Sequence, residues 1–337
     1  MSPNSSLPML SIGPTFSHSP AVNEDHGLAA LMNPGEAENF FALEGLTPFD
    51  PSSAAGFNRH SAMWLAEFCR LIYRQERDEL PHRPASFRTR AQILAEHGWR
   101  EEAVLRNRQG VPQAAVFGRT NPDGAVIVFR GTLGLRDMFT DLQLVLRPWA
   151  GAGHVHQGFK DAHAALWPAL KQQLPALRRP IFLTGHSLGG ALATMTAALC
   201  RTELPSHDIA ALYTFGSPRV GDRVFGAALQ SVSHFRVVNG RDVIPLLPPV
   251  IPNSVLPYFQ HTGQLHHIVG GNIQIFPSGT DLFASITTLP KMSDLRSLLA
   301  SGVGPVGKLP PFLTHHSPVN YVAKLEVASQ FVSQMQL

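Results

Sequence analysis

A serine flanked by glycines is the feature of this sequence that points most directly to chemistry. The segment Gly185–Gly189, GHSLG, follows a short run suited to a buried strand, Ile181–Thr184, and leads into an alanine-rich helical pattern. A sharp strand-to-helix turn strains the backbone of its central residue, and flanking glycines let strand and helix approach closely. The start of the helix also places N–H groups beside the serine hydroxyl. The pattern predicts that Ser187 is a nucleophile.

A serine hydroxyl needs a base to remove its proton, and the base needs a carboxylate to orient it. The best acid in the sequence is Asp242, which directly follows a strand-like stretch and a glycine turn. The best base lies in the segment Thr314–Pro318, THHSP, just before a helical pattern that starts near Asn320. Serine, acid and histidine then follow one another in the order that α/β-hydrolases use.

The elements that must position these residues alternate between strands and helices. Apolar runs bounded by turn residues predict strands at 103–106, 114–119, 125–130, 211–215 and 234–238, and helical spacing predicts helices at 62–74, 91–99 and 160–174. This alternation favours an α/β fold with a mainly parallel or mixed central sheet flanked by helices. Ligand chemistry is expected at the carboxyl ends of the strands.

Composition sets limits on the function. The 337 residues are 44% hydrophobic and carry a formal charge of only +3, with scattered basic residues. These values describe a globular protein, and we expect no nucleic-acid partner. The two cysteines, Cys69 and Cys200, lie in apolar helical patterns and are expected to be buried free thiols. No protein partner can be inferred.

The N-terminal region differs in composition from the rest. Residues 1–58 are rich in Ser, Pro, Asn and Gly, which predicts a partly disordered extension ahead of a catalytic domain at 59–337. The first 30 residues show no ordinary secretory signal, so localisation stays open. The longest stretch without charge, 243–280, is broken by prolines, and we expect no transmembrane segment.

Five motifs, in the right order, resemble those of the class 3 lipases, the family of the fungal triacylglycerol lipases. Besides the serine segment, the resemblance rests on four stretches: Phe129–Thr132, Val155–Phe159, Tyr213–Asp222 and Asn239–Pro249. It covers roughly residue 62 to the C-terminus. The resemblance implies an α/β-hydrolase fold, an ester hydrolase without a cofactor, and a lipid or ester substrate.

The resemblance also implies roles for individual residues. Ser187 corresponds to the nucleophile, Asp242 to the orienting acid and His316 to the general base. The backbone N–H groups of Thr132 and Leu188 correspond to the oxyanion hole. One such donor is worth roughly 3–4 kcal/mol of transition-state stabilisation.

The base segment departs from the family pattern at one position. Family members usually have Asp-His where this chain has His315-His316. The register against Ser317, Pro318 and Tyr321 favours His316 as the base, with His315 or another histidine such as His261 as alternatives. The loss of a carboxylate at position 315 would alter how the base is held.

Other polar residues are interpreted as structural. His154 and His156 have a spacing that can bind zinc, but no acidic or cysteine partners converge on them in sequence, so we expect no metal site. His156 is expected to form a hydrogen bond beneath the site, and Arg219 and Asp222 to hold their turn together. Asp137 and Asp141, which follow the oxyanion segment, are interpreted as capping or loop-fixing residues.

The substrate class depends on weaker signals. Apolar residues are frequent in 243–259, 282–289 and 298–313, which fits either core packing or an acyl groove. The amphipathic stretch Leu133–Val145 is interpreted as a lid that opens at a lipid–water interface. The leading hypothesis is hydrolysis of triacylglycerols or related carboxylesters. The alternatives are a phospholipid acyl hydrolase and an inactive lipid-binding protein.

Overall fold

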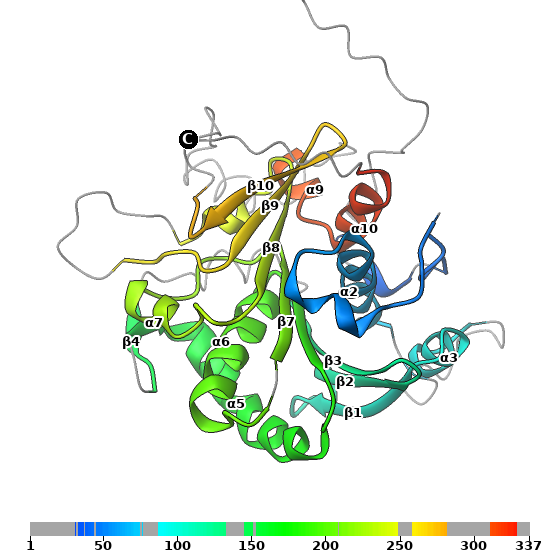
Figure 1. Ribbon diagram of the computed structural model, residues 1–337, viewed down its shortest axis with the longest axis horizontal. Helices are drawn as coiled ribbons and strands as arrows, with labels where there is room; N and C mark the ends of the chain where they lie inside the picture. The colour runs from blue at the N-terminus through cyan, green and yellow to red at the C-terminus, as the bar shows by residue number, and fades with distance from the viewer. Residues whose placement is uncertain are drawn as a thin grey trace, which may run out of the picture.

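A mixed β-sheet forms the centre of the computed structural model, with helices on both faces (Figure 1). The structure describes residues 31–328, except 32, 37, 44, 75, 77–86, 133–144, 151–152, 208, 249–257 and 282–310. Within these residues the large sheet has eight strands in the order β1-β2-β3-β6-β7-β8-β9-β10. The α/β architecture predicted from the alternating elements is therefore present.

The strands of the large sheet fall into a parallel centre and antiparallel edges. The five central strands β3, β6, β7, β8 and β9 are parallel, so their carboxyl ends meet at one edge of the sheet. The strands are β1 Arg100–Arg106, β2 Pro112–Thr120, β3 Asp123–Phe129, β6 Ile181–His186, β7 Ile209–Phe215, β8 His234–Asn239, β9 Gln264–Val269 and β10 Asn272–Ser278. A separate small sheet pairs β4 Leu146–Pro148 with β5 His154–His156.

Helices cover the two faces of the sheet with two separate cores. Alternate residues of β3 show the division: Val126 and Val128 pack towards α2 and α10, whereas Ile127 packs towards α5 and α6. α2 and α10 lie side by side although they come from opposite ends of the chain (Figure 1). The helices are α2 Arg59–Leu71, α3 Arg90–Glu96, α5 Gln157–Gln173, α6 Leu188–Glu203, α7 Arg223–Ala227, α9 Pro311–Thr314 and α10 Pro318–Val327.

Short 3-10 helices lie between the main elements, and α2 begins earlier than the sequence predicts. η1 Pro34–Glu36, η2 Pro51–Ala55, η4 Leu174–Ala176 and η5 Ile244–Leu246 lie in the connections. The predicted helix at 62–74 begins three residues earlier, because the Asn58 side chain accepts the Ser61 N–H at 2.9 Å and caps the helix there. Cys69 and Cys200 are buried and unbridged, as predicted, and burial raises the pKa of both thiols to about 12.

Aromatic side chains from the described residues between 33 and 58 pack into the core. Phe40, Phe41 and Phe49 are 5% exposed or less, and the Phe49 ring lies 5.0 Å from that of Phe182 in the strand before Ser187. The Trp64 indole N–H donates to the Thr47 carbonyl at 2.8 Å. A domain boundary at residue 58 stays a prediction, but the contacts show that the segment just before it shares the core of the large sheet.

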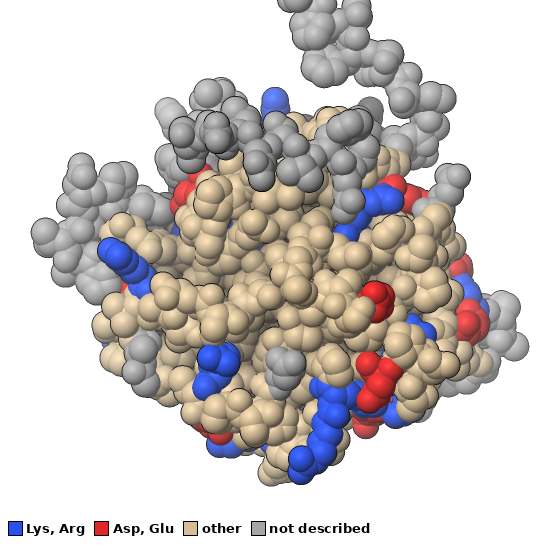
Figure 2. Space-filling model, in the orientation of Figure 1, with Lys and Arg blue, Asp and Glu red and all other residues tan. Residues whose placement is uncertain are grey.

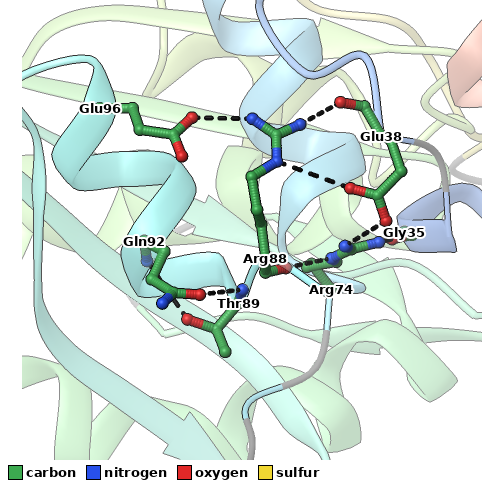
Figure 3. A network of polar contacts seen from close by, with 7 residues as sticks. All are labelled: Gly35, Glu38, Arg74, Arg88, Thr89, Gln92 and Glu96. Carbon is green, nitrogen blue, oxygen red and sulfur yellow. Dashed lines mark hydrogen bonds and ion pairs between the residues drawn. The ribbon is translucent and has the colours of Figure 1, made fainter. Parts of the chain in front are cut away.

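An arginine network ties this segment to α2 and α3 (Figure 3). Arg74, three residues beyond the end of α2, donates to the Gly35 carbonyl at 3.1 Å and to the Glu38 carboxylate at 2.7 Å. Arg88 bonds Glu38 and also reaches the Glu96 carboxylate at 2.8 Å. Beside it, Thr89 and Gln92 form a capping box that starts α3. The network joins three segments that are far apart in the sequence.

Arginine is unusually frequent inside this protein. The side chains of Arg70, Arg74, Arg90 and Arg219 are almost completely buried. On the face shown in Figure 2, uncharged residues fill the centre and the charged side chains lie towards the edge. These four basic side chains therefore contribute little to the charge of the surface. In the described parts of the chain, no helix has the length and apolarity needed to cross a membrane.

Candidate active site

The serine segment forms a tight turn between β6 and α6. Ser187 has φ 58° and ψ −128°, a left-handed conformation that side chains rarely adopt. A Cβ at Gly185 would lie 2.2 Å from the Gly189 backbone, and a Cβ at Gly189 would lie 2.1 Å from the Phe129 carbonyl oxygen. Only glycine fits at either position, so the strain predicted from the GHSLG pattern is present.

The acid and the base meet behind this turn. The His316 Nδ1 lies 2.9 Å from an oxygen of Asp242, and both side chains are buried. Asp242 follows β8, whereas His316 comes from the turn between α9 and α10, 74 residues later. With Nδ1 directed at the carboxylate, Nε2 is the ring nitrogen that remains for a reacting hydroxyl.

Asp242 is held from three sides. Its second oxygen accepts the Ile244 N–H at 2.9 Å, and the oxygen that faces His316 also accepts the Tyr321 hydroxyl at 2.6 Å. Burial, together with the Asp242 charge, raises the pKa of Tyr321 well above its ordinary value. The phenol therefore stays protonated, and its O–H donates a hydrogen bond to the carboxylate. Its oxygen accepts the Asn239 N–H at 3.1 Å, which ties α10 to the end of β8.

His186 packs the base against the serine turn. Its ring lies 4.5 Å from the ring of His316, and its Nε2–H donates to the His316 carbonyl at 2.6 Å. Burial lowers the pKa of His186 well below its ordinary value, so this imidazole is neutral. Because His186 directly precedes Ser187, this contact brings the base segment beside the serine.

The predicted oxyanion residues lie on two sides of the serine. Leu188 is the first residue of α6, so its N–H has no acceptor within the helix. Thr132 follows Gly131, at which a Cβ would lie 3.4 Å from the Ser187 Cβ and 3.0 Å from the Tyr73 hydroxyl. The Gly131 backbone and the Arg130 side chain both hydrogen-bond to Tyr73, and burial raises the pKa of that phenol. Tyr73 thus anchors the oxyanion segment from the end of α2.

The remaining histidines of the sequence prediction lie elsewhere. His261 is buried, and its Nε2 lies 2.6 Å from the Pro245 carbonyl. The histidine that hydrogen-bonds to Asp242 is His316. His156 caps α5 by accepting the Phe159 N–H at 3.4 Å. His154 binds the Asp222 carboxylate at 2.9 Å. Among the described residues no group of three potential ligands could hold a metal ion.

Arg219 and Asp222 hold more than their own turn. Arg219 forms an ion pair with Asp281 at 2.6 Å and donates to the carbonyls of Leu246 and Pro248, in the segment after Asp242. Asp222 caps α7 through the Phe225 N–H at 2.9 Å. Arg219 therefore fixes the chain that leads away from the acid. Asp137 and Asp141 lie outside the described residues.

Comparison with known proteins agrees with this geometry. The family model described as Lipase (class 3) matches residues 126–251, which contain Ser187 and Asp242. A secreted mono- and diacylglycerol lipase of Fusarium solani is 35% identical over 156 residues, covering 43% of this chain and 44% of that protein. Over this segment the chain is similar to the class 3 lipases. A lipase of Rhizomucor miehei is 36% identical over 140 residues, covering 36% of this chain and 37% of that one.

A solved structure of a lipase has the same fold as this chain. Lipase II from Rhizopus niveus superposes with a TM-score of 0.53 at 24% identity, covering 73% of this chain and 94% of that one. The fold is that of the α/β-hydrolases, as the sequence predicted. The chain spans less than half the length of the curated relatives named above.

Sequence reasoning missed the residues that support the site. Tyr321 and His186 lie next to predicted residues, but a lone tyrosine or histidine in an apolar pattern is most often a core residue. Tyr73 lies 114 positions before Ser187 in the sequence, at the end of a helix predicted only for its apolar face. No spacing rule connects these residues to the serine, because their contacts form only in the folded chain.

Proposed function

We propose that this protein hydrolyses carboxylic esters of lipids through an acyl-serine intermediate. The single observation that carries the proposal is the buried Asp242–His316 pair, joined through His186 to a serine in a strained strand-to-helix turn. This combination of nucleophile, base and orienting acid is what acyl transfer requires. The match to the class 3 lipase family model and the similarity to fungal lipases support the same chemistry.

In the proposed reaction His316 takes the Ser187 proton through Nε2 as the hydroxyl attacks the ester carbonyl. Asp242, holding the Nδ1–H, stabilises the imidazolium that forms. The N–H groups of Thr132 and Leu188 bind the oxyanion. His316 then gives the proton to the leaving alcohol, and water releases the acid by the same steps in reverse roles. No cofactor takes part in this scheme.

Lipid esters are the proposed substrates. The Fusarium solani relative is named for its action on mono- and diacylglycerols, which makes acylglycerols the first class to test. The predicted lid, Leu133–Val145, lies outside the described residues except for Val145, as do 282–289 and most of 298–313. Because the sequence predicts a lid, the proposal includes action at a lipid–water interface. It predicts that the rate on a long-chain ester rises sharply above the solubility limit of that ester.

The test measures fatty-acid release from emulsified mono-, di- and triacylglycerols and from phosphatidylcholine vesicles. The wild-type protein is expected to act on acylglycerols, and Ser187→Ala to lose at least a thousandfold in rate, because it removes the nucleophile. Ser206→Ala, at an exposed serine, is the matched control and should keep the wild-type rate. Dominant release from phosphatidylcholine would replace the acylglycerol proposal with the phospholipase alternative. Activity that survives in Ser187→Ala would contradict the mechanism.

A further inference from the structure

His315 occupies the position at which this chain departs from its family's Asp-His pattern. In the structure the Arg241 backbone N–H donates to the His315 Nδ1 at 2.8 Å. A ring nitrogen that accepts a hydrogen bond carries no proton, so His315 is neutral here with its proton on Nε2. The residue next to the base thus receives a hydrogen bond from the residue next to the acid.

The contact lies between the two turns that carry the acid and the base. The turn of Asp242 follows β8, and the turn of His316 lies between α9 and α10. A second bond joins them, because the Asn239 side chain donates to the His315 carbonyl at 3.0 Å. The His315 ring also packs on the backbone of Gly240, where a Cβ would lie 2.5 Å from Nδ1. The imidazole therefore fills the space between the two turns.

We propose that His315 is a positioning residue whose unprotonated Nδ1 holds the Asp242 turn against the His316 turn, so that catalysis requires His315 to be neutral. The inference rests on the proposed ester hydrolase activity. Protonation would place an Nδ1–H against the Arg241 N–H, and two donors cannot bond each other. The turns of the acid and the base would then lose one of the two hydrogen bonds through which His315 joins them.

The charged and titratable groups around His315 are consistent with a catalytic rate that depends on the protonation of His315. Arg241 has an exposed side chain, and Asp242 and His316 are buried. On the other side of Gly240, the His267 Nε2–H donates to the Gly240 carbonyl at 2.7 Å, and burial lowers the pKa of His267. His315 itself is half-buried, so solvent protons reach it. An ordinary histidine titrates near pH 6.5, within the range in which an esterase works.

Two variants distinguish the role of His315 as a hydrogen-bond acceptor from the effect of its protonation. In His315→Asn the amide oxygen takes the place of Nδ1 and accepts the Arg241 N–H, but it does not titrate. His315→Leu has a similar volume and no acceptor. Rates on p-nitrophenyl butyrate, a soluble ester, are measured from pH 5 to pH 9, and thermal unfolding checks that each variant is folded.

At pH 8 the Asn variant is expected to keep kcat within about threefold of wild type. The Leu variant is expected to lose at least tenfold in kcat with KM nearly unchanged. On the acid side, log kcat/KM of wild type should fall more steeply with pH than that of the Asn variant, because protonation of His315 adds one inactivating proton in the wild type only. A Leu variant with the wild-type kcat, or an Asn variant with the wild-type acid slope, would overturn the inference.

A second readout does not depend on catalysis. If the wild-type protein hydrolyses no ester, the proposed function fails, and nitrogen NMR of histidine- and arginine-labelled protein still decides on His315. The Arg241 amide signal should shift with the same midpoint as the His315 ring, and this shift should vanish in His315→Asn. An Arg241 amide that does not follow the ring would refute the role of His315.

Discussion

At the residue scale, residue types and spacing indicated a candidate nucleophile, Ser187, and a candidate acid, Asp242, but not which histidine is the base. The GHSLG pattern predicted the strained serine turn, because its geometry is local and needs only glycines at fixed positions. The pairing of Asp242 with His316 spans 74 residues, and here the choice among neighbouring histidines came from the family resemblance. The hydrogen bonds of Tyr321 and His186 depend on packing, which no short pattern encodes.

The Tyr321 hydroxyl should matter for the rate more than for folding. Tyr321→Phe removes a charge-assisted hydrogen bond to Asp242 and is expected to lower kcat about tenfold, corresponding to roughly 1.4 kcal/mol. The measurement is the steady-state rate on a soluble ester. Tyr213→Phe is the matched control, since Tyr213 is equally buried but bonds the Asn58 N–H, away from the acid. Equal losses in both variants would show that Tyr321 acts only on stability.

At the element scale, the strands and helices were largely predictable because their apolar periodicity is strong. Four of the five central parallel strands, β3, β6, β7 and β8, and the helices α5 and α6 appear close to their predicted places, with ends displaced by a few residues. The hairpin of β9 and β10 and the small sheet of β4 and β5 were not predicted as pairs. β4 and β5 have only three residues each, and β9 and β10 carry several polar residues, with Pro277 inside β10. Such strands are specified by their neighbours rather than by their own pattern.

The segment before α2 is the element whose role the composition concealed. Deleting residues 1–55 removes Phe40, Phe41 and Phe49 from the core and should lower the free energy of unfolding by several kcal/mol. A chain that starts at residue 31 retains all three rings, so comparing the urea midpoints of the two truncations isolates the part contributed by 31–55. Equal midpoints would mean that this segment is a dispensable tail.

At the scale of the whole molecule, buried histidines link stability to pH. Burial lowers the pKa of His163 to about 4 and those of His234 and His266 to about 3, and it lowers those of His186 and His261 well below their ordinary value. These five rings are neutral in the folded protein. In the unfolded chain they bind protons below about pH 6.5. The unfolded state is therefore favoured as pH falls.

Stability should be fully present above pH 6.5 and be lost as pH falls from 6.5 towards 3. Each such histidine contributes up to about 1.4 kcal/mol per pH unit in this window. Urea unfolding at pH 8, 6 and 5 measures the slope, and His163→Gln should reduce it by about one proton. Stability that stays constant between pH 8 and 5 would contradict the neutral, buried state of these side chains.

The central claim is that Ser187 is a nucleophile activated by His316 and Asp242. The most direct measurement is reaction of the protein with a fluorophosphonate, followed by mass spectrometry of the modified peptide. The account predicts stoichiometric modification at Ser187, none in Ser187→Ala, and at least hundredfold slower modification in His316→Ala. A protein that folds normally but takes up no label, or takes it up at another serine, would show that this site does not perform serine chemistry.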